Sequence, residues 1–432
     1  MKALNIYENE ISRIPDAPTV LIGSGAIAEL PRLLSDMRVR SAFVFADKNT
    51  YTAAGHKVVS ALNSAGIATK EYVFSSDRVE PSESFVGLAM MSFDPTLDAV
   101  VAVGSGVIND ISKIVAKVSG KKYAVVATAP SMDGYASATS SMSVGGLKTS
   151  LPSKCADIII GDTDVLRDAP MKMLISGLGD MLAKYVALCE WRISEIINGE
   201  PVSYEVADMV RASLKKCVDN APGLLSRDET ATAAVFEGLV FCGLAMKLAG
   251  TSRPASGIEH YLSHIWDMRG EEFGTPVELH GLQCAVGTYI AVGLYESIKS
   301  CTPDRDRALS YVRGFDYTEW SGRLKDFLGR GADAMIALEA KEGKYDRQKH
   351  SARLDRIIEH WDEILAVISD ELPTVTELTA LYDAVGMPKS MAEIGIDGGI
   401  LKTTFAAAKD IRDKYVLPRL AFDLGIIEDM KF

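Results

Sequence analysis

The sequence predicts an α/β protein: an N-terminal parallel-sheet domain over residues 1–165, followed by an all-helical domain over residues 166–432. Three observations support this prediction. Short β-branched runs alternate with helical patterns up to about residue 160. A glycine-rich turn, Gly104-Ser105-Gly106, directly follows one of the apolar runs. From about Asp168 onward, helical periodicity continues and the strand signal largely disappears.

The expected strands are short apolar runs, and each except the last two is followed by a helical pattern. Alternation of this kind builds a parallel sheet with helices on its faces, and a nucleotide then binds at the carboxyl ends of the strands. A polar stretch rich in Ser, Thr and Gly separates the last two runs. The strands are expected at 18–22, 41–46, 71–74, 99–103, 123–127 and 157–160, and the helices at 26–37, 47–65, 82–91 and 106–118.

Charge, cysteine spacing and the apolar stretches limit the kind of protein that this chain can be. The net charge of −12 disfavours bulk attraction to nucleic acid or to an anionic membrane, so an anionic ligand must be met by local cations. The six cysteines are widely spaced without a CxxC pair, which indicates reduced thiols and a cytoplasmic location. The N-terminus has no apolar signal-peptide core. We expect the apolar stretches 231–250 and 282–294 to be buried helices.

The turn formed by Gly104, Ser105 and Gly106 is a candidate cradle for a cofactor pyrophosphate. It joins a strand to a helix, where backbone N–H groups meet an anion at the helix N-terminus. The third glycine of the GxGxxG pattern is absent, because Asn109 stands there, so a turn without a ligand stays an alternative. The polar loop that includes Thr128 and Ser131 follows the next strand and favours nucleotide binding.

Asp47 ends the second expected strand and has two possible roles. It can accept hydrogen bonds from an adenosine ribose, as acidic residues do in dinucleotide-binding folds. The run from Asp47 to Thr50 is also a good helix N-cap. The preference between NAD and NADP therefore stays open.

Three of the six histidines, His260, His264 and His280, lie close together in an apolar helical region. Imidazole is a common ligand of Zn, Ni and Fe, and a carboxylate would complete such a site. Asp180 is the leading carboxylate because it interrupts an apolar helix, where an unpaired charge is costly. We predict a metal held by Asp180, His260 and His280, with His264 facing the substrate. Glu259 is expected to point away from the ligand face and to support the site without binding the metal itself. The alternative is that the histidines are hydrogen-bonded core residues and that Asp180 lies on a helix surface.

Several motifs together resemble the sn-glycerol-1-phosphate dehydrogenases, specifically their bacterial AraM-like branch, in the superfamily of iron-containing alcohol dehydrogenases, glycerol dehydrogenase and dehydroquinate synthase. The likeness spans nearly the whole chain. The motifs are GSGVINDISK at 104–113, TAPSMDGYAS at 128–137, GLGDMLAK at 177–184, SRPASGIEHYLSH at 252–264 and LHGLQCAVG at 279–287.

The resemblance implies a Rossmann-like NAD(P)-binding domain, a helical metal-binding domain and an active site in the cleft between them. It also implies interconversion of dihydroxyacetone phosphate and sn-glycerol 1-phosphate, with one divalent metal (Zn or Ni, with Fe possible) polarising the C2 oxygen during hydride transfer. A homo-oligomer is expected. The implied cofactor residues are Gly104, Ser105, Gly106, Asp110, Thr128, Ser131 and Ser137, with Asp133 near the substrate.

The substrate phosphate needs dedicated cations in so acidic a protein. Lys148, Lys184 and Arg253 are the candidates, although a lysine on a helix or hairpin is more often solvated. Three other functions stay open: a glycerol or other polyol dehydrogenase without phosphate recognition, a cyclising lyase resembling dehydroquinate synthase, and a nucleotide-binding homologue without catalytic activity.

Overall fold

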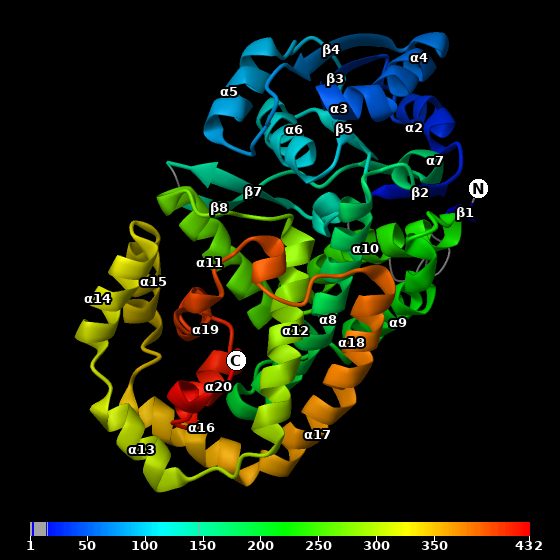
Figure 1. Cartoon of the computed structure of the whole chain (residues 1–432). Helices are drawn as coiled ribbons and strands as arrows, with labels where there is room; N and C mark the ends of the chain where they lie inside the picture. The colour runs from blue at the N-terminus through cyan, green and yellow to red at the C-terminus, as the bar shows by residue number, and fades with distance from the viewer. Residues whose placement is uncertain (1, 4–13, 15, 146) are drawn as a thin grey trace. The chain divides into compact units, whose positions relative to one another are not determined.

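Six strands run parallel in one sheet, in the order β2-β9-β6-β5-β3-β4, and the short strand β1 pairs antiparallel with β2 at the edge (Figure 1). The computed structural model describes residues 2, 3, 14, 16–145 and 147–432, and only the backbone of 2, 3, 147 and 148. Each of the six expected strands overlaps an observed one, which confirms the predicted parallel sheet. The strands are β1 Lys2–Ala3, β2 Thr19–Gly23, β3 Ser41–Asp47, β4 Ala68–Phe74, β5 Ala99–Gly104, β6 Lys122–Ala127 and β9 Ile158–Asp162.

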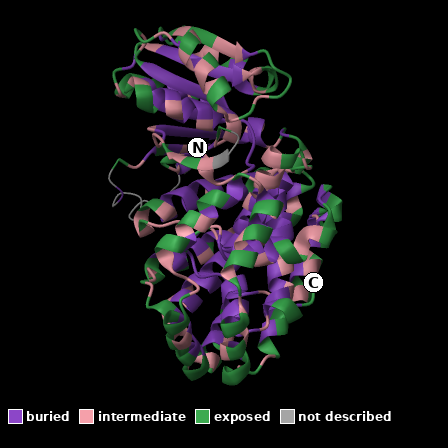
Figure 2. Ribbon diagram, turned by 90° about the vertical axis from the view of Figure 1, so that its left-hand side faces the viewer, coloured by how far each residue is buried: buried purple, intermediate pink, exposed green. Residues whose placement is uncertain are grey.

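The two faces of the sheet pack against different helices, because successive side chains of a strand point to opposite faces. On β3, Ala42, Val44 and Ala46 join a buried cluster with apolar side chains of α2 (Leu30–Asp36) and α4 (His56–Ser64). Phe45 lies on the other face and stacks on Phe74, which meets Phe85 of α5 (Glu83–Ser92). Helix α6 (Gly106–Ser119) packs beside α5. Figure 2 shows central strands of the sheet as buried and the outer surfaces of the helices as exposed, whereas the edge strand β4 is mostly exposed or half-buried.

This arrangement creates a topological switch point at the carboxyl ends of β3 and β5. The two strands are neighbours in register, with Phe45 opposite Ala102. After β3 the chain reaches α4 on one face of the sheet, whereas after β5 it enters α6 on the other. Nucleotides bind at such a switch point in open parallel sheets. Asp47 and Gly104 end the two strands, so both lie at this edge.

The polar stretch after β6 contains a second, two-stranded sheet. Strands β7 (Thr139–Val144) and β8 (Leu147–Pro152) pair antiparallel, with Thr139 opposite Pro152. No strand was predicted here, because the run is rich in serine and has few of the apolar side chains that mark a strand.

From Thr163 to the C-terminus the chain forms helices and no strand, which confirms the predicted change to all-helical structure. The chain divides into two compact units, which we call the sheet unit (1–181 and 212–251) and the helical unit (182–211 and 252–432). The domain limits 1–165 and 166–432 stay a prediction. The helices are α7 Thr163–Leu166, α8 Met171–Asn198, α9 Tyr204–Asn220, α10 Glu229–Ala249, α11 Ile258–Phe273, α12 His280–Lys299, α13 Arg305–Gly314, α14 Tyr317–Leu328, α15 Gly331–Glu342, α16 Arg347–Glu359, α17 Trp361–Glu371, α18 Val375–Val385, α19 Leu401–Ala408 and α20 Leu417–Asp423, with α3 (Lys48–Thr50) before them; short 3-10 or π turns cover 26–29, 51–55, 134–136, 221–224, 392–394, 398–400 and 427–429.

The two apolar stretches at 231–250 and 282–294 lie in α10 and α12 and are largely buried, as predicted. Helix α10 begins where the carboxylate of Asp228 accepts a hydrogen bond from Ala231 N–H and ends at Gly250 in the left-handed conformation. By length and composition α10 could cross a membrane, but 72% of its apolar window is buried inside the protein, as in a core helix. None of the six cysteines, all of which lie in the described part of the chain, forms a disulfide, as expected.

Candidate functional site

The glycine-rich turn sits at the carboxyl edge of the sheet, as predicted. Gly104 ends β5, Ser105 is the N-cap of α6 and Gly106 begins that helix. A Cβ on Gly104 would lie 2.6 Å from Cβ of Ile108, so glycine lets α6 pack closely on its own strand. The first N–H groups of α6 have no partner within the helix and point toward this edge, which is the arrangement that binds a phosphate.

Asp47 caps the helix that follows β3. Its carboxylate accepts a hydrogen bond from Thr50 N–H at 2.8 Å, and its own N–H donates to the Thr50 hydroxyl at 3.0 Å. The predicted N-cap role is therefore confirmed. Contact with a cofactor ribose stays a prediction for the same residue.

The loop after β6 is fixed to α6 by Lys113, which the sequence analysis did not single out. Thr128 N–H donates to the Gly104 carbonyl at 3.2 Å, so this loop begins beside the glycine-rich turn. Lys113 is fully buried and donates to the Gly134 carbonyl, to Ser137 Oγ and to the Thr139 carbonyl. Burial lowers the pKa of this ammonium group, and nearby Asp110 opposes the shift.

The remaining predicted cofactor residues have structural partners of their own. The Asp110 carboxylate accepts from Ser141 N–H at 3.2 Å, and the Ser131 carbonyl accepts from Ser176 Oγ at 3.0 Å. Ser137 Oγ donates to the Thr139 carbonyl at 2.9 Å. These bonds position the edge of the sheet; contact of these residues with a cofactor stays a prediction.

Asp180 is buried on α8 and is held by the loop that contains Asp133. The backbone N–H of Asp133 donates to Oδ2 of Asp180 at 3.0 Å. One turn earlier, a Cβ on Gly177 would lie 1.8 Å from the Pro130 carbonyl oxygen, so only glycine allows the loop to approach α8 this closely. The two predicted residues, Asp133 for substrate and Asp180 for metal, therefore adjoin in the sheet unit.

The three histidines meet in the helical unit. His260 and His264 lie on α11, and His280 is the first residue of α12. The ring centroids of His260 and His280 are 5.0 Å apart, and that of His264 is 5.9 Å from His280 and 6.4 Å from His260. The helices are close here, since a Cβ on Gly287 would lie 2.8 Å from the Glu259 carbonyl oxygen. The predicted clustering of the imidazoles is thus present.

Hydrogen bonds fix the orientation of two of these rings. Oε1 of Glu259 lies 2.9 Å from Nδ1 of His260, and Oγ of Ser263 lies 3.1 Å from Nδ1 of His280. A cation bound to these histidines would therefore be bound through Nε2. Such partners fix the tautomer of metal-ligating histidines. Ser263 was not predicted, although it stands three residues after His260 on the same helix.

Cys284 also belongs to this cluster. Ligand atoms of His260, His280 and Cys284 all lie within 4.8 Å of one another, close enough to hold one ion. Cys284 follows His280 by one helical turn, and its Sγ lies 3.5 Å from Nε2 of that ring. The spacing of four residues in HGLQC was the signal that could have identified it. The donor set of two imidazoles with a sulfur or a carboxylate suits Zn²⁺ or Ni²⁺.

A second buried carboxyl group, Glu190 on α8, lies next to Glu259. A Cβ on Gly257 would be 2.5 Å from Oε2 of Glu190 and 2.9 Å from Oε2 of Glu259, so both oxygens crowd this glycine. Burial raises the pKa of Glu259 to about 7, and burial together with repulsion from Glu259 raises the pKa of Glu190 to about 8. The backbone N–H groups of Ile258 and Leu417 donate to Glu190 at 2.9 Å and 2.7 Å.

The candidate cations for a substrate phosphate differ in their surroundings. Lys184 is fully buried on α8, and its charge opposes the rise that burial causes in the pKa of Glu259. Arg253 is 2% exposed and donates to Glu200 at 2.8 Å and 2.5 Å and to the Tyr415 carbonyl at 2.9 Å. Lys148 is on β8, and its side chain lies outside the described part of the chain. Their roles toward a substrate stay predictions.

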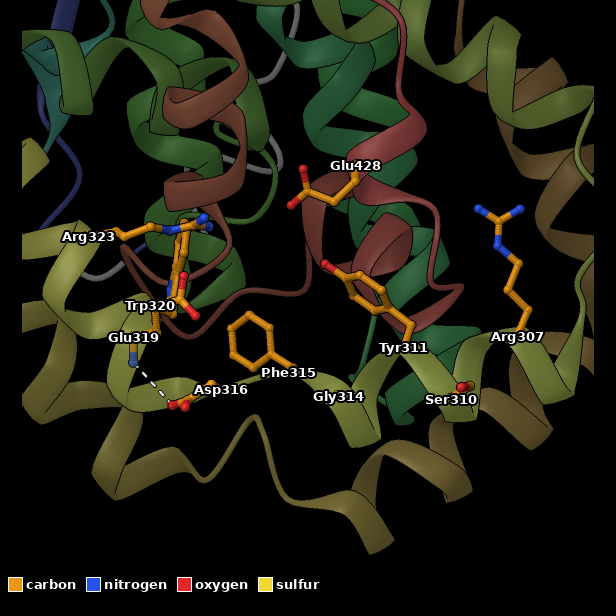
Figure 3. Close-up of a pocket in the computed structure, with 10 residues that line it drawn as sticks. All are labelled: Arg307, Ser310, Tyr311, Gly314, Phe315, Asp316, Glu319, Trp320, Arg323 and Glu428. Atoms are coloured by element: carbon orange, nitrogen blue, oxygen red, sulfur yellow. Dashed lines mark hydrogen bonds between the residues drawn. The ribbon is translucent and has the colours of Figure 1, made fainter.

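A cavity of about 530 Å³ opens in the helical unit between α13, α14 and the C-terminal segment (Figure 3). Tyr311, Phe315 and Trp320 line it together with Arg307 and Arg323. None of the predicted site residues lies in its wall. It therefore contributes nothing to the candidate metal centre.

The chain is similar in sequence and in fold to several known proteins. The model for iron-containing alcohol dehydrogenases matches residues 21–170. The chain is 27% identical to a glycerol-1-phosphate dehydrogenase of Halalkalibacterium halodurans over 92% of this chain and 90% of that one. It is 32% identical to the enzyme of the same name from Bacillus velezensis over 66% of this chain and 74% of that one. The fold is similar to a crystal structure of a probable glycerol dehydrogenase from Sinorhizobium meliloti, with a TM-score of 0.60, 15% identity and 95% coverage of each chain.

Proposed function

Because the chain belongs to the glycerol-1-phosphate dehydrogenase family, we propose that it reduces dihydroxyacetone phosphate to sn-glycerol 1-phosphate with NAD(P)H, and catalyses the reverse reaction. The observation that carries the proposal is the pair of imidazoles, His260 and His280, whose Nδ1 atoms are both engaged by neighbouring side chains. Such a pair is arranged to hold a divalent cation through Nε2. The proposed ligands are Asp180, His260 and His280.

A divalent ion held there supplies Lewis-acid polarisation of a carbonyl group, and a nicotinamide supplies the hydride. Residues of the chain orient these groups. Glu259 and Ser263 fix the two imidazole rings, and the backbone N–H of Asp133 fixes the Asp180 carboxylate. His264 lies one turn after His260 on the same face of α11, and the centroids of the two rings are 6.4 Å apart. We propose that His264 contacts the substrate rather than the ion.

The cofactor is proposed to lie across the carboxyl edge of the sheet, with its pyrophosphate on Gly104, Ser105 and Gly106. The switch point between β3 and β5 supports this placement. Asp47 lies beside the proposed adenosine ribose. The segment that contains Thr128, Ser131 and Ser137, with Asp110 beside it on α6, is proposed to face the nicotinamide.

The substrate is proposed to be a small phosphorylated triose. Lys148, Lys184 and Arg253 are the proposed cations for its phosphate. We further propose that the protein acts in the cytoplasm as a homo-oligomer, with Zn²⁺ or Ni²⁺ as its metal and without a nucleic-acid partner.

The direct test compares dihydroxyacetone phosphate with dihydroxyacetone as oxidants of NADH and of NADPH. Hydrogen bonds to a charged group are worth roughly 1.5–3 kcal/mol each, so kcat/KM should fall by about 10-fold or more when the phosphate is absent. The product is then assayed against both enantiomers of glycerol phosphate. Equal kcat/KM for the two ketones would reject phosphate recognition and favour a polyol dehydrogenase.

A further inference from the structure

We propose that the helical unit binds a small oxyanion, of the size and charge of phosphate, in a cavity of about 170 Å³ whose wall includes Arg419, Lys344 and Lys414. Drug-sized ligands occupy pockets of roughly 300–1,000 Å³, so this cavity is too small for a nucleotide. It is a separate cavity from the one shown in Figure 3.

The wall of this cavity has a large excess of positive charge. Five cationic side chains line it, against two carboxylates; the cations are Arg253, Lys344, Arg353, Lys414 and Arg419, and the acids are Glu200 and Asp413. In a protein with a net charge of −12, such a concentration of cations is unexpected for a surface without a ligand. A polyvalent anion is the complementary ligand.

Three of the five cations form ion pairs with carboxylates, and one of them, Arg419, does so through Nη2 to Asp410. Arg353 donates to both carboxylate oxygens of Asp423, at 2.8 Å and 2.9 Å. Arg253 donates to Glu200. The proposal therefore depends on Lys344 from the turn after α15, on Lys414 before α20, and on the Nε and Nη1 atoms of Arg419 in α20.

Arg419 has hydrogen-bond donors that the protein does not satisfy. The side chain is 3% exposed, and its Nη2 donates to Oδ1 of Asp410 at 2.9 Å and to the Lys409 carbonyl at 3.3 Å. Its Nε and Nη1 atoms are buried without any hydrogen-bond partner among the described residues. A buried donor without an acceptor destabilises the folded protein, and an oxyanion would supply acceptors for this guanidinium.

The two lysines lack carboxylate partners. Neither Lys344 nor Lys414 forms an ion pair in the described part of the chain; Lys344 donates to the Arg412 carbonyl, and Lys414 donates to the carbonyl and hydroxyl oxygens of Ser256. Burial, together with the charge of Arg253, lowers the pKa of Lys414 to about 7. Burial and the charge of Arg419 lower the pKa of Lys344. These mutual repulsions are what a bound anion would relieve.

The oxyanion has two possible sources, free phosphate or the phosphoryl group of the triose substrate. The cavity site does not depend on the proposed function, because phosphate binding is measured without substrate or cofactor. Kinetics with the phosphorylated ketone then distinguish the two sources.

The test measures binding of inorganic phosphate by calorimetric titration and by the shift in Tm, with NaCl at matched ionic strength as the reference. We expect phosphate to raise Tm of the wild-type protein. Lys344→Met should weaken phosphate binding about tenfold, the loss expected for one charge-assisted hydrogen bond. Lys344→Arg keeps the charge and should retain most of the affinity.

Lys349→Met is the matched control, because Lys349 is exposed and likewise donates to a backbone carbonyl, that of Glu342. It should bind phosphate as the wild type does. A raised KM for dihydroxyacetone phosphate in Lys344→Met would identify the substrate phosphoryl group as the ligand, and an unchanged KM would identify a free anion. Absence of a phosphate effect beyond that of NaCl, or equal affinity in the wild type and Lys344→Met, would overturn the proposal.

Discussion

Oε1 of Glu259 accepts a hydrogen bond from Gly257 N–H at 2.6 Å and lies 2.9 Å from Nδ1 of His260. The carboxyl group is thus fixed at the start of α11 and fixes the ring in turn. Because Nδ1 of His260 is hydrogen-bonded to this carboxylate, the proposed metal binds at Nε2. The same hydrogen bond increases the basicity of the His260 imidazole.

Glu259→Gln should therefore lower the affinity for Zn²⁺ or Ni²⁺ by about 10- to 100-fold, the usual effect of losing a partner of a ligating histidine. Competition titration with a chromogenic chelator measures this directly. Glu363→Gln is the control, because Glu363 makes a similar contact at the surface, 3.2 Å from Nδ1 of His360. Equal affinities of the Glu259 variant and the wild type would show that the contact has no role in metal binding.

The two histidines of α11 should separate in function. His260→Ala is expected to abolish stoichiometric metal binding, and kcat should fall with it, because a proposed ligand is removed. His264→Ala should keep the metal and raise KM for the ketone. Metal analysis after gel filtration, together with steady-state kinetics, distinguishes these outcomes. Loss of metal from the His264 variant with retention in the His260 variant would reverse the assignment.

A side chain on Gly257 should destabilise the helical unit. A Cβ there would meet Oε2 of Glu190 and Oε2 of Glu259 at 2.5 Å and 2.9 Å. Gly257→Ala should lower the free energy of unfolding by about 1–3 kcal/mol, as overpacking of a buried site does. Gly293→Ala on α12 is the control, because its Cβ would meet no atom within 4 Å, and it should be neutral or stabilising. Equal stability of the two variants in urea unfolding would contradict this packing.

Glu190 should make the stability of the protein depend on pH. Burial, and to a smaller extent repulsion from Glu259, raises the pKa of Glu190 from 4.5 to about 8. Between pH 4.5 and pH 8 the folded protein therefore keeps a proton on Glu190 that the unfolded chain has lost. The contribution of this proton to the free energy of unfolding is fully present below pH 4.5 and is lost as the pH rises through 8. Each unit of pKa shift corresponds to about 1.4 kcal/mol.

The measurement is the free energy of unfolding of the wild type minus that of Glu190→Gln, followed across this pH range. The difference should decrease with rising pH and level off above pH 8. A constant difference from pH 4 to 9 would show that Glu190 does not titrate as described.

Local sequence patterns were sufficient to predict the parallel sheet and the clustering of the histidines. Apolar runs such as 99–103 specify buried strands by themselves, and His260 and His264 share a helical face because of their spacing. The hairpin of β7 and β8 was missed because its serine-rich strands lack the apolar side chains on which strand prediction depends.

Contacts between segments that are far apart in the sequence could not be predicted from local patterns. Glu190 and Glu259 are 69 positions apart, and only the packing of α8 against the start of α11 brings their carboxyl groups together. Lys113 resembles an ordinary helical lysine in sequence, and its burial under the 134–139 segment follows from tertiary structure. The bonds that engage Arg253 likewise depend on Glu200 and Tyr415, which are remote in sequence.

The most direct test of the proposed metal centre is anomalous diffraction from crystals of the protein loaded with Zn²⁺ or Ni²⁺. The predicted result is one strong peak about 2.0–2.2 Å from a carboxylate oxygen of Asp180 and from Nε2 of both His260 and His280, with Cys284 outside the coordination sphere. A peak coordinated by Cys284 without Asp180, or no ion at these histidines, would contradict the assignment on which the proposed function rests.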